Sequence, residues 1–216
     1  MTEPKISTKE NLKEAFAQLR EVNPLLEITD RTINGSVYKV FKNAPKTMRE
    51  LFTVIELLHG DFPFIVEGKN ELTFAETIQK AKNICTYLNK LGIKPGDKVG
   101  ICMQNCTEWV VIYVALAAYG ATVVPFNSWW KKEELSYGVE HSEVKLIFSD
   151  TKRYESLKNL NIEIIVNEPI DNKQTFNEIV SGTSTEWPEA NATEEDISVL
   201  LYTSGSTGLP KGVMLT

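Results

Sequence analysis

The 216-residue sequence is 42% hydrophobic and carries a formal net charge of −6. Such a chain is long enough to bury a sizeable core, and its acidic pI, near 5.2, argues against nucleic acid as a partner. The three cysteines and two histidines lack zinc-ligand spacing. We therefore expect no metal site, and reduced thiols at Cys85, Cys102 and Cys106.

The amino-terminal part of the sequence contains no residues to which we assign a catalytic or binding role. Its first residues, MTEPKISTKENLKEAF, lack the apolar core of a secretory signal, which favours a cytoplasmic location. Residues 1–71 mix strand-like and helix-like patterns. We expect this leading segment to pack against the sheet predicted below.

Strand and helix patterns alternate between residues 72 and 166. The run LTFAETIQKAKNICTYLNKLG opens with Thr73 and Glu76 in capping-box spacing and ends at Gly92, which predicts an amphipathic helix. Short apolar runs, KVGICMQ, KLIFSD and IEIIV, indicate buried strands, and a further helix is expected around 133–139. This alternation predicts an α/β fold with a doubly wound, mostly parallel sheet and helices on both faces.

One uncharged stretch, Trp109 to Phe126, is about as long as the shortest membrane-spanning helices. Asn105 and Glu108 suit a capping box that starts a helix, and Gly120 suits the position after its end. We therefore expect a buried helix followed by a buried strand at 121–125, and no transmembrane segment.

Residues 167–196 are polar and acidic, which is typical of an exposed connector. The last segment, 197–216, begins with a buried strand and continues into a loop of small and hydroxyl-bearing residues with a lysine just beyond it: Thr203, Ser204, Gly205, Ser206, Thr207, Gly208 and Lys211. Glycines let backbone N–H groups turn toward an anion, hydroxyls add donors, and lysine adds charge.

This composition also fits a flexible Ser/Gly linker. The buried strand before the loop, the Pro-Lys-Gly run after it and the strand-like GVMLT that follows favour a phosphate-binding loop between two strands.

The run YTSGSTGLPKGV, Tyr202 to Val213, resembles the phosphate-binding signature of the adenylate-forming superfamily, which comprises acyl-CoA synthetases, peptide-synthetase adenylation domains and luciferases. LTFAE, LGIKPGDKVGI, QNCTEW, YGATVVPFN, EELSYGVEHSEVKLIFSD and VFKNAPKTMREL are similar to other landmarks of that family's large domain, so the resemblance covers most of the chain. PFNSWWKKEELSYG is most similar to bacterial acyl-CoA synthetases that act on fatty or related acids.

The resemblance implies an ATP-dependent, AMP-forming carboxylic acid:CoA ligase. In that family a carboxylate attacks the α-phosphorus of ATP to give acyl-AMP and pyrophosphate, and a thiol, usually that of CoA, then displaces AMP. The resemblance also implies that the loop and Mg²⁺ share the β- and γ-phosphates. The implied contacts are the hydroxyls of Thr203, Ser204, Ser206 and Thr207, the N–H groups near Gly205 and Gly208, and the Lys211 charge.

Other motifs of the family are missing from these residues: a Tyr-Gly-x-Thr-Glu stretch, an Arg-Thr-Gly-Asp stretch and a C-terminal lysine. The run YGAT, Tyr119 to Thr122, has Val123 where the glutamate would stand, so we expect it to be structural. We expect catalytic residues beyond Thr216, and a 216-residue chain that is inactive alone and able to self-associate at its truncated end.

Two alternatives to a CoA ligase remain. One is a non-catalytic module that binds phosphate or a partner chain. The other is part of a peptide-synthetase adenylation domain, whose acceptor is a carrier-protein thiol.

Outside the loop, few residues invite a functional interpretation. His59 and His141 are isolated in the sequence, and we expect them at the surface or at helix ends. Trp129 and Trp130 could line an acyl-chain path or touch a membrane surface, but an aromatic pair beside a helix start is more typical of packing.

Overall fold

The computed structural model describes residues 9–33, 35–203 and 208–216. They form two compact units that divide between Pro45 and Lys46. The first unit contains α1 (Lys9–Val22), the 3-10 turn η1 (Pro24–Leu26) and an antiparallel hairpin of β1 (Ile28–Ile33) and β2 (Ser36–Phe41). None of the apolar side chains described in this unit is buried, so local hydrogen bonding and the hairpin define its structure.

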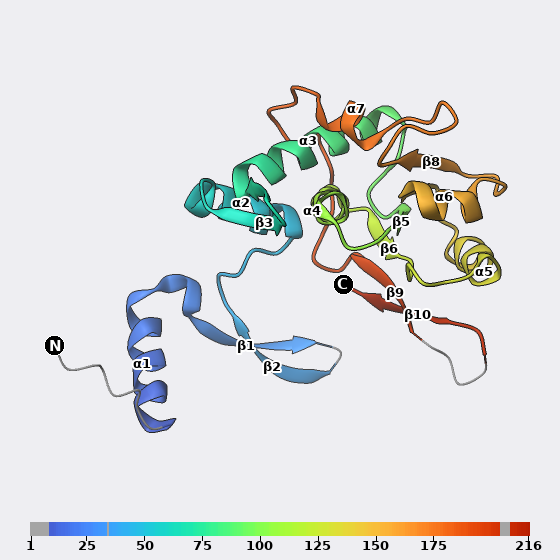
Figure 1. Ribbon diagram of the computed structural model, residues 1–216. Helices are drawn as coiled ribbons and strands as arrows, with labels where there is room; N and C mark the ends of the chain where they lie inside the picture. The colour runs from blue at the N-terminus through green and yellow to red at the C-terminus, as the bar shows by residue number, and fades with distance from the viewer. Residues whose placement is uncertain (1–8, 34, 204–207) are drawn as a thin grey trace. The chain divides into compact units, whose positions relative to one another are not determined.

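The second unit is a twisted sheet with its covering helices (Figure 1). Its helices are α2 (Met48–His59), α3 (Phe74–Lys90), α4 (Thr107–Tyr119), α5 (Lys132–Ser142), α6 (Thr151–Leu157) and α7 (Phe176–Val180). Its strands are β3 (Pro63–Glu67), β4 (Asn70–Thr73), β5 (Lys98–Cys102), β6 (Thr122–Pro125), β7 (Leu146–Ser149), β8 (Glu163–Val166), β9 (Val199–Thr203) and β10 (Lys211–Leu215). β3 and β4 pair with each other as a separate antiparallel hairpin.

The main sheet has the strand order β10-β9-β6-β5-β7-β8 among the described residues. Its pairs are parallel except for β10, which runs antiparallel to β9. Helices α3 and α4 cover one face, while α5 and α6 cover the other (Figure 1). Val99 and Ile101 of β5 pack toward α3 and α4, and Ile147 of β7 packs on the opposite face. The predicted fold class, a doubly wound and mostly parallel α/β sheet, is confirmed.

The capping signals in the sequence describe both ends of α3 and the carboxyl end of α4 correctly. The Thr73 side chain accepts from the Glu76 N–H at 3.2 Å, and the Glu76 carboxylate accepts from the Thr73 N–H at 2.8 Å. That second bond is the main reason that the pKa of Glu76 is lowered. Gly92 and Gly120, with φ of +79° and +83°, adopt the left-handed conformation that follows a helix end.

The predicted capping role of Asn105 is wrong. Helix α4 begins at Thr107, and its N-cap residue Cys106 makes no side-chain capping bond. Instead the Glu67 carboxylate, from β3, accepts from the Thr107 N–H at 3.1 Å and the Thr107 hydroxyl at 2.7 Å. A carboxylate at this position also suits the positive end of the helix dipole, so a residue distant in sequence replaces the local cap.

The stretch from Trp109 to Phe126 divides as predicted into the buried helix α4 and the buried strand β6. In the ranges that the structure describes, none of the helices combines the length and apolarity needed to cross a membrane.

Beyond residue 71, two helices among the described residues were not anticipated. Helix α6 separates β7 from β8, and the Asp150 side chain caps it by accepting from the Arg153 N–H at 2.8 Å. Helix α7 lies inside the segment 167–196 and begins with a capping box of Thr175 and Glu178. The polar segment is therefore partly helical.

β10 lies at the edge of the sheet and pairs only with β9 among the described residues. Its Val213, Met214 and Leu215 side chains are exposed. An edge strand with apolar side chains can pair with a second chain, so self-association stays a prediction.

We predict that Thr73→Ala lowers the free energy of unfolding by about 1 kcal/mol, because it removes one half of the α3 capping box. Urea unfolding followed by circular dichroism measures this change. Thr53→Ala is the matched control, since the Thr53 hydroxyl donates only to the Arg49 carbonyl oxygen inside α2 and alanine favours the helix. An unchanged unfolding midpoint in Thr73→Ala would contradict the capping role.

Candidate functional site

The candidate phosphate loop lies between the antiparallel strands β9 and β10. Thr203 and Lys211 are register partners at the end of this pair, and the Thr203 hydroxyl donates to the Lys211 carbonyl oxygen at 3.4 Å. Gly208 has φ of +90°, a left-handed conformation that favours glycine. The two predicted strands are thus present, with Thr203 and Lys211 side by side. The remaining predicted contacts lie outside the described residues: Ser204, Gly205, Ser206 and Thr207.

This hairpin ends at the carboxyl edge of the parallel sheet. Since β9 runs parallel to β6, Thr203 lies at the edge where β5, β6 and β7 also end. Ligands of open α/β sheets bind outside this edge. Here the buried Arg153 guanidinium forms an ion pair with Asp150 at 2.9 Å and donates to the Ser128 carbonyl oxygen at 3.1 Å. That network ties the loops after β6 and β7 together at this edge of the sheet.

Aromatic side chains pack against Tyr202, the residue before Thr203. The Trp130 ring meets the Tyr202 ring edge to face at a centroid distance of 5.4 Å, and Phe126 stacks on Tyr202 at 6.4 Å. The packing role predicted for Trp130 is therefore confirmed. Trp129 does not pack, because 83% of it is exposed.

Both histidines lie in the last turns of helices, as predicted, His59 in α2 and His141 in α5. His141 is not isolated, however, since its Nδ1 lies 2.8 Å from the hydroxyl oxygen of Tyr202. Its ring also stacks on Tyr137 at a centroid distance of 5.2 Å. The i, i+4 spacing of Tyr137 and His141 was the available sequence signal, but nothing local linked it to a strand some sixty residues later.

The run YGAT is structural, as predicted. Tyr119 is 1% exposed, and its hydroxyl donates to the Ile93 carbonyl oxygen at 2.7 Å. Gly120 then turns the chain from α4 into β6.

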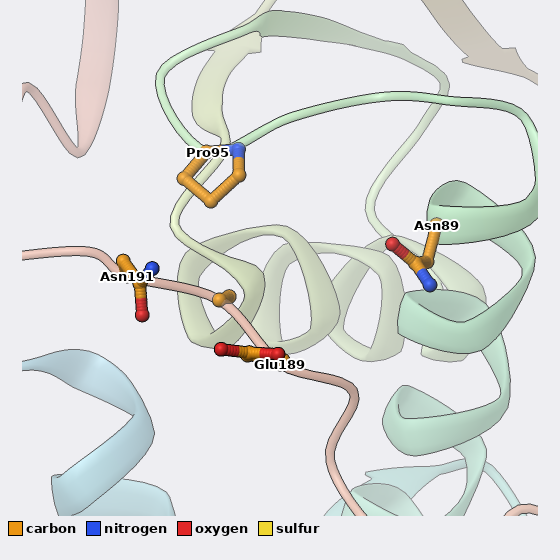
Figure 2. A pocket seen from close by; sticks show the side chains of 5 residues that line it. Asn89, Pro95, Glu189 and Asn191 are labelled. Atoms are coloured by element: carbon orange, nitrogen blue, oxygen red, sulfur yellow. The ribbon is translucent and has the colours of Figure 1, made fainter.

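A polar depression of about 420 Å³ lies elsewhere in the second unit (Figure 2). Its lining residues are Asn89, Pro95, Glu189, Ala190 and Asn191. Pro95 precedes β5, so the depression lies at the amino ends of the strands, the edge opposite to Thr203. The depression is not part of the candidate phosphate site.

The cysteines are unsuited to nucleophilic chemistry. All three are free thiols. Burial raises the pKa of Cys85 and of Cys102 to about 12, and that of the half-buried Cys106 to about 11. No group of three or more His, Cys, Asp or Glu side chains in the described ranges could hold a metal ion.

The sequence matches the AMP-binding enzyme family over residues 57–216. This chain belongs to that family. The resemblance to adenylate-forming enzymes is thereby confirmed, and the loop with Thr203 and Lys211 falls within the matched residues.

Relatives of this chain include both peptide synthetases and CoA ligases. It is 31% identical over 145 residues to a linear gramicidin synthase protein of Brevibacillus parabrevis, with 67% of this chain and 2% of that protein covered. It is 30% identical over 161 residues to 4-coumarate–CoA ligase 2 of Solanum tuberosum, with 71% and 30% covered. The chain therefore spans less than a third of the length of these relatives.

Solved structures show the same fold. The anthranilate CoA ligase AuaEII in complex with anthranoyl-AMP superimposes with a TM-score of 0.74 at 22% identity, covering 80% of this chain and 35% of that one. A Mycobacterium tuberculosis fatty acyl CoA synthetase superimposes with a TM-score of 0.67 at 21% identity, covering 79% and 34%. The second unit thus has the fold of adenylate-forming enzymes.

We predict that iodoacetamide modifies Cys85 and Cys102 in the native chain more than about a hundred-fold more slowly than in urea near pH 8. The thiolate is the reactive form, and the raised pKa values keep both thiols protonated there, whereas unfolding returns them to an ordinary pKa. Mass spectrometry of timed samples measures the rates. Cys106, half-buried, should react faster than the other two, and rapid native labelling of Cys85 would contradict its burial.

Proposed function

We propose that this chain supplies the phosphate-binding part of an ATP-dependent, AMP-forming carboxylic acid:CoA ligase that acts on a fatty or related acid. The observation that carries the proposal is the β9–β10 hairpin, which holds Thr203 and Lys211 side by side at the carboxyl edge of the sheet. Membership of the AMP-binding enzyme family and the similarity to CoA ligases support it.

In this proposal the hairpin binds the leaving pyrophosphate portion of ATP. The Lys211 ammonium contributes a positive charge, while glycines allow backbone N–H groups to approach the phosphates. The Thr203 hydroxyl would exchange its bond to the Lys211 carbonyl oxygen for one to a phosphate oxygen. Both side chains are exposed, so no buried charge opposes binding. Fixed donors of this kind stabilise developing negative charge without reorganisation during the reaction.

In this proposal, Mg²⁺ is held at the site by the phosphates of ATP and not by side chains of the described residues. The described residues hold no cluster that could bind a metal by itself, whereas hydroxyl and ammonium groups suit phosphate oxygens. When bound with ATP, Mg²⁺ would neutralise phosphate charge. CoA would act in the second half-reaction as the acceptor thiol.

A second candidate is the adenylation domain of a peptide synthetase. The similarity to the linear gramicidin synthase protein favours it, and the loop would have the same role there. A non-catalytic phosphate-binding module is the third possibility. ATP–pyrophosphate exchange by the full-length protein with fatty, aromatic and amino acids distinguishes them: exchange with fatty acids supports the ligase, exchange with amino acids alone supports the peptide synthetase, and no exchange supports the module.

We predict that Lys211→Ala weakens ATP binding about ten-fold, because it removes a charge-assisted contact to the phosphates. Isothermal titration calorimetry with the 216-residue chain measures the affinity. Lys69→Ala is the control, since Lys69 is an exposed lysine in the β3–β4 turn. Equal ATP affinity of Lys211→Ala and the unaltered chain would remove Lys211 from the site.

We also predict that the 216-residue chain alone catalyses no acid-dependent pyrophosphate exchange, even where it binds ATP. The motifs that the family uses for adenine, ribose and the C-terminal lysine are not among its residues. The measurement is incorporation of labelled pyrophosphate into ATP, with the full-length protein as positive control. Exchange by the purified chain above the no-acid background would refute this prediction.

A further inference from the structure

One turn of helix α5 contacts strand β9 and the residue just before strand β10, on the two sides of the phosphate loop. His141 Nδ1 lies 2.8 Å from the hydroxyl oxygen of Tyr202, and the Tyr137 hydroxyl donates to the Pro210 carbonyl oxygen at 3.5 Å. Tyr202 immediately precedes Thr203, and Pro210 immediately precedes Lys211. The helix therefore touches the entry and the exit of the loop, each one residue from a predicted phosphate contact.

The three rings form one packed group. Tyr137 stacks on His141 with an interplanar angle of 27°, and His141 meets Tyr202 at 67° with a centroid distance of 5.8 Å. Both are favourable aromatic arrangements. Since Tyr137 and His141 are four residues apart, they lie above one another on the helix surface. A displacement of the chain at Tyr202 or at Pro210 would thus disturb the contacts of Tyr137 and His141, which lie on the same turn of α5.

The hydrogen bonds around Tyr202 are mutually consistent. Its hydroxyl has one proton, and it can donate to the Gly138 carbonyl oxygen at 3.5 Å. The shorter bond joins the hydroxyl oxygen to His141 Nδ1 at 2.8 Å, and which of the two atoms donates depends on the histidine tautomer. Burial raises the pKa of Tyr202, which keeps the hydroxyl protonated at neutral pH.

Helix α5 lies close to the rings of Phe126, Trp130 and Tyr202, and this packing requires glycine at position 138. A Cβ there would lie 2.6 Å from the Trp130 ring and 3.2 Å from the Phe126 ring. Both rings pack on Tyr202. The absence of a side chain at Gly138 therefore lets α5 approach the aromatic group closely enough for His141 to reach Tyr202.

We propose that Tyr137, His141 and Tyr202 form a clamp that holds the two ends of the phosphate loop in register before the nucleotide binds. This inference rests on the proposed function, because it assigns the clamp a role in phosphate binding. The three are positioning residues, which act through Thr203 and Lys211. Ordering the loop ends in advance lowers the conformational entropy lost on binding, and so tightens binding without a new contact to the ligand.

The experiment is a double-mutant cycle of His141→Leu and Tyr202→Phe in the 216-residue chain, with ATP affinity as one readout. Amide hydrogen exchange at residues 200–203 and 211–215 without nucleotide is the other. We expect each substitution to weaken ATP binding about two- to ten-fold, the range of one hydrogen bond, and to speed exchange at both strands. The double variant should be little worse than either single variant, because both remove the same interaction.

Three further variants refine the cycle. His141→Asn places a polar nitrogen or oxygen near the position of Nδ1 and should restore part of the affinity. Tyr137→Phe should speed exchange at 211–215 more than at 200–203, since it removes only the bond to Pro210. His59→Leu, which alters an exposed histidine at the end of α2, should change neither readout. Unchanged exchange in α3 shows that each variant is folded.

The two readouts separate the clamp from the proposed function. If the unaltered chain binds no ATP, the proposed function of this chain fails, and the coupling in hydrogen exchange still decides whether the clamp exists. Fully additive effects of His141→Leu and Tyr202→Phe on exchange would overturn the clamp. Faster exchange with unchanged ATP affinity would overturn its role in phosphate binding.

Discussion

The candidate site depends on the pairing of β6 with β9. These parallel strands share one register pair, Val123 with Val199, and the Val123 N–H donates to the Ser198 carbonyl oxygen at 2.8 Å. The Thr122 hydroxyl adds a bond to the Ile197 carbonyl oxygen at 2.8 Å. Because side chains alternate along a strand, a slip of one residue would exchange the faces of the whole hairpin. These few bonds therefore determine where Thr203 and Lys211 lie.

Such a non-local pairing needs the intervening chain to be held in place, and side chains of two earlier helices do this. The Asn83 side chain, in α3, donates to the Val180 and Gly182 carbonyl oxygens at 2.9 Å each and accepts from the Ser184 N–H at 2.9 Å. Arg49, in α2, donates to the Pro188 carbonyl oxygen at 2.8 Å. The polar segment before β9 thus has fixed anchor points, which reduces the entropy lost when β9 joins the sheet.

Local signals in the sequence were sufficient for much of the fold. Capping boxes, helix-ending glycines and short apolar runs act over a few residues, so the ends of α3 and the division of α4 from β6 could be predicted. The cap at the start of α4 could not be predicted, because Glu67 supplies it in place of Asn105 and reaches Thr107 only through the hairpin of β3 and β4. The contact between His141 and Tyr202 was missed for the same reason. In the loop itself, the residue types indicated phosphate chemistry, but only the fold places Thr203 opposite Lys211.

The alternation of side chains along β9 also separates support from binding in the candidate site. Tyr202 and Thr203 are consecutive, so their side chains point to opposite faces of the hairpin. Leu200 and Tyr202 face α5. Packing on this face is tight, because a Cβ on Gly212 of β10 would lie 2.8 Å from the Leu200 side chain. Thr203 and its partner Lys211 lie on the other face. Dense packing on the α5 side therefore fixes the orientation of the strand and leaves the two phosphate-binding candidates uncovered by the aromatic rings.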